Sequence, residues 1–207
     1  MIHLVAMRDD LTEFQHVHPQ PTGTPGEFAV DITFAKPGRY VLNSDLRRRG
    51  AMSDIVFRQY VTVQGTAESI PLVEDRSAKV IDGVRVELDG VAHVGGPSEL
   101  EFHFTDAQTG APMTDLKPYL SAAGHLIVAS QGLYTIDHGH GEAFDASGSE
   151  LWAMPGASLG PDISFHHRFG APGLYKLWGQ FQTASGQIIT ANARSPPRWR
   201  RSQAWLR

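Results

Sequence analysis

Alternating hydrophobic and polar residues run through the chain and predict β-strands. Apolar side chains occupy every second position of residues 28–34, and the same alternation, with one histidine in the series, runs through 163–169. A period of two is typical of a strand that buries one face. Pro-Gly pairs at 37–38 and 172–173 mark turns between successive strands. Since no segment sustains a 3.6-residue apolar pattern beyond a turn or two, the expected fold class is all-β.

The chain also repeats itself, which predicts two tandem units of one fold. A histidine pattern recurs with the same internal spacing, first as His3, His16 and His18 and then as His125, His138 and His140. Further along, residues 34–42 match 169–177. Residues 79–193 have room for about seven strands, the number that an immunoglobulin-like sandwich uses. We therefore expect two immunoglobulin-like β-sandwich units.

The two units differ in length, and the predicted boundaries follow from that difference. We expect a first unit at 1–66, a linker at 67–78, a complete second unit at 79–193 and a disordered basic tail at 194–207. His3 has far fewer residues before it than His125 has within its own unit. The sequence therefore predicts that the first sandwich is N-terminally incomplete and that any export signal is absent from this chain. The alternative is a first unit that is naturally short.

The repeated histidines are placed to converge on one face of a sheet. A hairpin turn centred between Asp10 and Leu11 would set His3 opposite His18, and His16 lies two residues before His18 on the same face. The equivalent hairpin of the second unit turns near Gly132 and sets His125 beside His138 and His140. Three imidazole nitrogens that meet at a point about 2.0–2.1 Å away can hold a transition-metal ion. Each unit is thus predicted to carry one histidine triad.

The residue types of the triads restrict the metal. Neutral imidazoles suit copper(II), zinc or nickel and not magnesium or calcium. Within the repeat, Asp45 aligns with Gln180, and Asp31 aligns with His166. We expect Asp45 and His166 to act as a fourth or outer-shell ligand, Asp45 being the better donor because a carboxylate would complete the first triad.

Composition narrows the function classes. The chain has no cysteine, which excludes thiolate metal sites and disulfides. The last 14 residues hold five arginines and no acid, so the remainder is more acidic than the net charge of −4 suggests. An acidic body argues against a nucleic-acid partner and is compatible with cation binding. The chain has no apolar run of the roughly 20 residues that a membrane helix needs.

Other interpretations of the histidines stay open. The triads could be hydrogen-bonded clusters that only help packing, a zinc enzyme centre with an open fourth position, or incidental features of an adhesive or scaffolding sandwich. His103, which alternates with Phe102 and Phe104, is expected to face solvent.

Residues 115–128, the His138-Gly139-His140 pair and residues 165–177 together resemble a family of exported bacterial tandem β-sandwich proteins described as secreted or heavy-metal-binding. A single unit is more distantly similar to YtkA-like and copper-resistance sandwiches. The duplicated triads, which have no acid/base partner on their face, favour a non-enzymatic metal-binding protein, with copper favoured over zinc. The resemblance implies an exported protein with an immunoglobulin-like fold and a metal-related role. It also allows a second cell-envelope protein as a partner.

Overall fold

The computed structural model describes residues 2–46, 50, 52, 55–195 and 198–199. Every regular element among these residues is a β-strand, so the predicted all-β class is confirmed. The chain separates into two compact units, Met1–Leu72 and Val73–Arg207, which divide inside the predicted linker. Within the described residues there is no helix that is long and apolar enough to cross a membrane.

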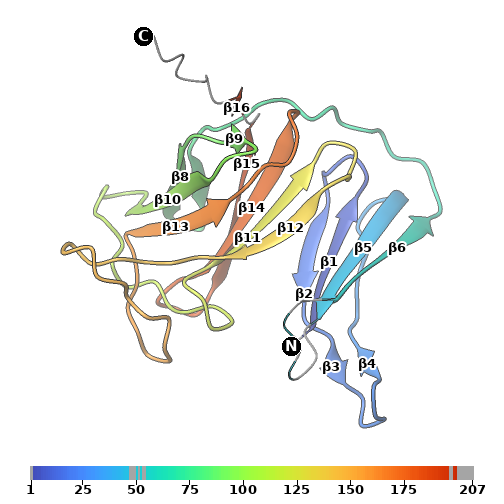
Figure 1. Ribbon diagram of the computed structural model, residues 1–207, viewed down its shortest axis with the longest axis horizontal. Helices are drawn as coiled ribbons and strands as arrows, with labels where there is room; N and C mark the ends of the chain where they lie inside the picture. Colours follow the sequence, from blue (N-terminus) through green and yellow to red (C-terminus); the bar gives the residue numbers. More distant parts are fainter. Residues whose placement is uncertain (1, 47–49, 51, 53–54, 196–197, 200–207) are drawn as a thin grey trace, which may run out of the picture. The chain divides into compact units, whose positions relative to one another are not determined.

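Unit 1 is built on one antiparallel sheet with the strand order β2-β1-β5-β6 (Figure 1). Its strands are β1 (Ile2–Arg8), β2 (Phe14–Val17), β5 (Gly38–Leu46) and β6 (Ile55–Val63), and β3 (Gln20–Pro21) pairs with β4 (Phe28–Ala29) in a separate ribbon. Strand β1 is central, since it pairs with β2 on one side and with β5 on the other. The side chains on one face of this sheet line, together with residues 28–32, a largely apolar pocket of about 700 Å³.

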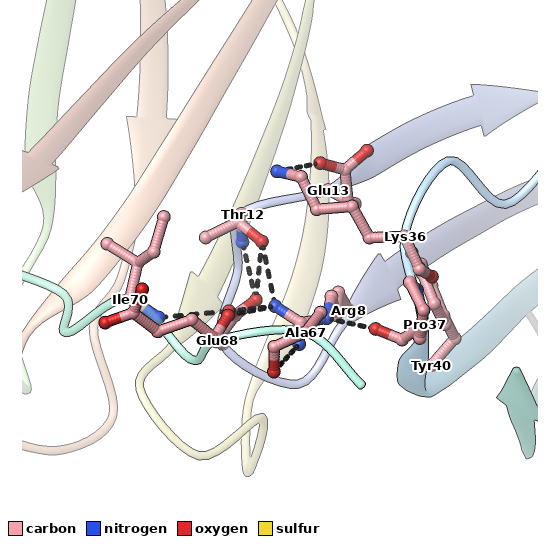
Figure 2. A network of polar contacts seen from close by, with 10 residues as sticks. Arg8, Thr12, Glu13, Lys36, Pro37, Tyr40, Ala67, Glu68 and Ile70 are labelled. Atoms are coloured by element: carbon pink, nitrogen blue, oxygen red, sulfur yellow. Dashed lines mark hydrogen bonds and ion pairs between the residues drawn. The ribbon is translucent and has the colours of Figure 1, made fainter. Parts of the chain in front are cut away.

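A buried ion pair of Arg8 belongs to a network of polar contacts in unit 1 (Figure 2). The Arg8 side chain pairs with Asp10, and only 5% and 4% of the two side chains are exposed. The guanidinium also donates to the carbonyl oxygens of Pro37, at 2.9 Å, and of Glu68, at 3.3 Å. Burial raises the pKa of Asp10, but hydrogen bonds from Thr12 and the charge of Arg8 outweigh it and hold the pKa below its usual value. Arg8 therefore fixes the start of the predicted linker to unit 1.

Unit 2 is a β-sandwich of two four-stranded antiparallel sheets (Figure 1). One has the order β13-β10-β8-β7, with β7 (Lys79–Ile81), β8 (Val84–Gly90), β10 (Ser98–Asp106) and β13 (Asp162–His167). The other has the order β12-β11-β14-β15, with β11 (His125–Ser130), β12 (Ile136–His140), β14 (Tyr175–Gln182) and β15 (Ile188–Ser195). Aromatic rings fill the space between the sheets: Phe102 and Phe104 of β10 lie 5.1 and 4.6 Å from the ring of Phe181 of β14.

The sheet that contains the histidine hairpin has the same strand order in both units. A tyrosine at the start of the third strand also makes the same bond in each. The Tyr40 hydroxyl donates to the Lys36 carbonyl at 2.9 Å, and the Tyr175 hydroxyl donates to the Ala171 carbonyl at 3.0 Å. Both bonds span four residues next to a Pro-Gly turn, a local feature typical of immunoglobulin-like sandwiches.

Ordered structure continues into the segment that the sequence assigns to a disordered tail. Strand β15 includes Arg194 and Ser195, and β16 (Arg198–Trp199) pairs in parallel with β9 (His93–Val94). These four residues therefore belong to strands, whereas 196–197 and 200–207 lie outside the described residues, so the disorder expected of the tail as a whole stays a prediction. Strand β15 also holds the first residues of unit 2, because the backbones of Asp75 and Arg194 exchange hydrogen bonds of 2.9 and 2.7 Å. The last part of the predicted linker thus belongs to unit 2.

Candidate metal centres

The triad of unit 1 lies on the β1–β2 hairpin, in the register expected from the sequence. Val5 pairs with His16 and Leu4 with Val17, so the register continues to His3 opposite His18. The turn is tight because Leu11 adopts a positive φ of 62° and Asp10 accepts a bond from the Thr12 amide. One-residue slippage would move His3 to the opposite face of the sheet.

The three rings of this triad converge. Nδ1 of His3 lies 3.2 Å from Nε2 of His16 and 3.2 Å from Nε2 of His18. The rings of His16 and His18 are 4.8 Å apart between centroids. Nitrogen ligands of a tetrahedral ion at about 2.05 Å are about 3.3–3.4 Å from each other. The separations of His3 Nδ1 from the other two nitrogens are thus close to the spacing that a shared metal ion requires.

Strand β5 brings a carboxylate alongside the same triad. Asp45 is the partner of His3 in the β1–β5 register, so both residues are on one face of the sheet. Asp45 is half-buried there. Its predicted role as fourth ligand remains a prediction.

The triad of unit 2 lies on the β11–β12 hairpin. His125 pairs with His140 and Ile127 with His138, which agrees with the turn expected near Gly132. Nδ1 of His125 lies 2.7 Å from Nε2 of His138. The ring of His140 lies 4.9 Å from each of the other two rings. The His125 and His138 nitrogens are at hydrogen-bonding distance, so a shared metal ion would require them to move about 0.6 Å farther apart.

A backbone carbonyl sets the orientation of His125, which is fully buried. Nε2 of His125 lies 3.1 Å from the carbonyl oxygen of Tyr119. Since a carbonyl only accepts, Nε2 of the neutral ring carries the proton and Nδ1 keeps its lone pair toward His138. This is the outer-shell contact that metal-ligating histidines usually make. Sequence reasoning missed it, because a backbone acceptor has no residue-type signal.

Tyr119 also covers His125 with its ring, 5.4 Å away between centroids and nearly perpendicular. Burial raises the pKa of the Tyr119 hydroxyl, so this phenol stays neutral near pH 7 and adds no charge to the site.

Strand β14 supplies a neutral counterpart of Asp45. Gln180 pairs with His125 in the β11–β14 register, is buried, and its amide nitrogen lies 3.3 Å from the hydroxyl oxygen of Thr190. The two triads therefore differ in one neighbouring side chain, a carboxylate in unit 1 and an amide in unit 2.

The remaining predicted ligand stands apart from the triad. His166 lies on β13, in the other sheet of unit 2, and its Nε2 is 3.7 Å from a carboxylate oxygen of Glu142. It shares with His138 the lining of a pocket of about 460 Å³. Asp31, which aligns with His166 in the repeat, is exposed and follows β4 in unit 1. The part that His166 plays in metal binding stays a prediction.

A family model described as a domain of unknown function (DUF8832) matches residues 1–64 and 78–195. The chain belongs to the DUF8832 family. The family description names no ligand, so the heavy-metal-binding family expected from the sequence is not shown by this match. The matched residues of the DUF8832 chain include both triads.

Solved structures add little to this DUF8832 assignment. A Bacillus anthracis protein provisionally described as a lipoprotein has 13% identity and a TM-score of 0.31, over 65% of this chain and 82% of its own. A conjugate transposon protein from Bacteroides vulgatus has 8% identity and a TM-score of 0.24, over 62% and 90%. Both scores lie below 0.5, so neither similarity supports a conclusion. The comparison with curated proteins finds no match.

Proposed function

We propose that this DUF8832 chain is a metal-binding protein in which each histidine triad holds one transition-metal ion. The observation that carries the proposal is the placement of the His3 Nδ1 atom, 3.2 Å from Nε2 of both His16 and His18. Packing alone does not require three ring nitrogens to meet at the spacing of a coordination sphere. The oriented and buried His125 supports the same role in unit 2.

Copper is the proposed ion. Imidazole binds copper(II), nickel and zinc, and copper(II) binds most tightly to a given set of nitrogen ligands among the divalent first-row ions. Two similar centres in one chain suit storage, transfer or resistance better than catalysis, which needs only one centre. Copper(II) should therefore displace zinc(II) from both triads.

The test compares copper(II) and zinc(II) titrations of the wild type with those of a His138→Ala/His140→Ala variant. The variant should bind one equivalent fewer of each ion. The copper signal that is present in the electron paramagnetic resonance spectrum of the wild type and absent from that of the variant should show nitrogen hyperfine coupling. His93→Gln, which changes a histidine outside both triads, is the matched control and should keep the wild-type stoichiometry. Equal stoichiometry in wild type and double variant would reject the metal assignment for unit 2.

Asp45 is proposed to complete the first centre. Asp45→Asn removes a charge and keeps the shape, so copper affinity in unit 1 should fall by about 10- to 100-fold while unit 2 is unchanged. The reciprocal change, Gln180→Glu, should strengthen the unit 2 centre. Unchanged affinity in both variants would mean that the two centres bind through histidine alone.

We further propose that the protein acts outside the cytoplasm, bound to a metal and in contact with another cell-envelope protein. The resemblance to exported tandem sandwiches supports this location. Fractionation of the source cells with an antibody against unit 2 tests it, and recovery of the protein only from the cytoplasmic fraction would contradict it.

A further inference from the structure

Strand β6 forms one edge of the sheet of unit 1 (Figure 1). Its nine residues, Ile55–Val63, pair with β5 in one continuous register that has no bulge. In the part of the chain that the structure describes, no strand and no isolated bridge pairs with the other edge of β6. An edge of this kind presents a row of N–H and C=O groups to which another strand can bind.

The other long edges of the four-stranded sheets are partly covered by backbone. Strand β15 has the place in unit 2 that β6 has in unit 1, and Asp75 pairs with it through Arg194. Strand β13 pairs with Glu142 through Ser164, by bonds of 2.9 and 2.8 Å. The remaining edge strands, β2, β7 and β12, have only four, three and five residues. Among the described strands, β6 is thus the long edge that has no such cover.

The sequence of β6 also lacks the devices that usually protect an edge. It contains no proline, no glycine and no acid, and Arg58 is its one charged residue. The exposed fractions of Val56, Phe57 and Tyr60 are 59%, 54% and 53%. Successive residues of a strand face opposite sides of the sheet, so apolar side chains are exposed on both faces. Long apolar edges with few charges favour pairing with another strand.

A hydrogen bond at the end of β1 identifies the backbone groups of β6 that point away from β5. The Asp9 amide donates to the Arg39 carbonyl at 2.9 Å, in the register of β1 with β5. Odd-numbered residues of β5 therefore bond to β1, and even-numbered ones bond to β6. Each even-numbered residue of β5 is paired with an odd-numbered residue of β6. The even-numbered residues of β6 thus direct their N–H and C=O groups outward.

We propose that β6 pairs in antiparallel fashion with β6 of a second copy of this chain, around a two-fold axis at Gln59. Even-numbered residues then pair with even-numbered ones, so the outward N–H and C=O groups of the two copies bond to each other. All nine residues of the strand have a partner in this register. A two-fold pair of edges closes on itself, which gives a dimer and not a filament.

The charge and shape of the β6 side chains complement themselves in this register. Arg58 lies opposite Tyr60 of the second copy, and a cation is attracted to an aromatic ring. Phe57 lies opposite Val61 of the second copy, an aromatic and β-branched pair of the kind that stabilises sheets. Moving the copies by two residues in one direction would set the two Arg58 side chains opposite each other, and like charges destabilise such a pair. The charge therefore favours the register centred on Gln59.

This dimer does not depend on metal binding, because β6 carries no residue of either triad. The proposal therefore stands or falls apart from the proposed function, and the metal-free chain is used to test it. The competing description is an edge that binds a strand of a different protein. It predicts that the pure chain stays monomeric.

The first experiment uses the absence of cysteine from the chain. Gln59→Cys sets two thiols opposite each other in a non-hydrogen-bonded pair, with Cα atoms about 4.5 Å apart, a separation at which a disulfide can form. Oxidation with diamide should therefore give a disulfide-linked dimer. Thr62→Cys is the matched control, because Thr62 is exposed on the same strand and its two copies would be about 20 Å apart. This control should stay unlinked.

The second experiment measures sedimentation over a series of protein concentrations. The wild type should show a monomer–dimer equilibrium. Tyr60→Lys sets a lysine opposite Arg58 twice in the dimer, so its dimer dissociation constant should rise about 10-fold. Arg58→Glu/Tyr60→Lys sets opposite charges against each other and should restore the dimer. Circular dichroism verifies that each variant keeps its β-structure.

Three results would overturn the proposal. One is a wild-type chain that stays monomeric or forms open-ended assemblies. Another is equal linking of Gln59→Cys and Thr62→Cys, which would mean that β6 does not pair around Gln59. The third is a dimer that Tyr60→Lys leaves unchanged, which would place the contact between copies elsewhere on the chain.

Discussion

At the scale of single residues, Gly141 lets the chain at the end of β12 approach the core of unit 2 closely. A Cβ atom at this position would lie 2.7 Å from Cγ2 of Ile163 and 2.8 Å from Cζ of Phe165. Both neighbours are buried core side chains and cannot move away freely. Gly141 directly follows His140, so the close approach also fixes the triad against the sandwich.

Gly141→Ala should therefore destabilise unit 2, by about 1–3 kcal/mol, through overpacking. Urea denaturation followed by tryptophan fluorescence measures the change. Gly170→Ala is the control, since a Cβ at Gly170 meets nothing within 4 Å, and its effect should stay within about 0.5 kcal/mol. Equal stability of the two variants would show that the core relaxes around the added methyl group.

Asp75 makes the stability of unit 2 depend on acid pH. Its carboxylate lies 2.7 Å from the Lys79 ammonium and 3.1 Å from the Arg194 guanidinium. The hydrogen bonds from Lys79 and Ser77 hold the pKa of Asp75 far below the usual value of an aspartate. The folded state thus favours the charged form, and the resulting stability is complete above about pH 4 and is lost as the pH falls through and below that value.

Asp75→Asn should lower the stability of unit 2 at pH 7 by about 1 kcal/mol. The difference from wild type should shrink below pH 4 and vanish once the wild-type carboxylate is protonated. Thermal unfolding at a series of pH values checks this. A difference that is constant from pH 7 to pH 2 would mean that the lost contacts do not depend on charge.

The residues of the triads could be predicted from the sequence, whereas their surroundings could not. The spacing of His3, His16 and His18 fixes a shared face once the hairpin register is known. The contact of His125 with the Tyr119 carbonyl depends on a turn in which Leu120 and Ser121 have φ values of 53° and 68°. Such left-handed positions usually carry glycine or asparagine, so the sequence gives no signal of this turn.

At the scale of elements, register was the most predictable feature. Period-two alternation and a turn centred between Asp10 and Leu11 were enough to set β1 against β2, because a shift by one residue would expose the apolar side chains. The ends of the elements were less predictable. Arg194 and Ser195 extend β15 into a basic segment. Only their pairing with Lys176 and Tyr175 of β14 shows that the strand continues there.

The Arg8–Asp10 pair connects three elements of unit 1, and removing one partner should cost more than removing both. Arg8→Met leaves the Asp10 carboxylate buried without its counter-ion and frees the carbonyls of Pro37 and Glu68, for an expected loss of about 3–5 kcal/mol. The double variant Arg8→Met/Asp10→Leu removes both charges and should be more stable than Arg8→Met alone.

Chemical denaturation of the two variants and the wild type gives the comparison. Lys36→Met is the control for loss of an exposed ion pair, because Lys36 pairs with Glu13 at 2.6 Å with 44% of its side chain exposed, and its effect should not exceed about 1 kcal/mol. If Arg8→Met has the same small effect, the Arg8 contacts do not hold the end of unit 1 together.

At the scale of the whole molecule, the two units differ in how much of their apolar surface is covered. In unit 2, two sheets enclose one continuous core that includes Phe102, Phe165 and Phe181. In unit 1, 46% of Phe28 and 54% of Phe57 are exposed, and both line the pocket of the single large sheet. Less apolar burial means less stabilisation, so unit 1 should be the weaker of the two.

Limited proteolysis of the metal-free chain should therefore cleave unit 1 first and leave a fragment that begins near Val73. Mass spectrometry of the fragments over time identifies the cuts. Survival of residues 2–72 after unit 2 has been degraded would contradict the predicted order. If the first triad binds copper(II) as proposed, adding the ion at about 100 times its dissociation constant should stabilise unit 1 by about 2.7 kcal/mol, because an ion held by the triad would bind only the folded hairpin.

That protection should disappear in His16→Ala, which removes a triad ligand from β2, and persist in His93→Gln, which lies outside both triads. Cleavage of unit 1 is a sensitive reporter because its stability is low, so a modest binding energy changes the fraction of chains that are open to the protease. The same digestion thus measures two properties, the unequal stability of the units and the coupling of the first triad to the fold of its sheet. Protection that is equal in both variants would separate copper binding from that triad.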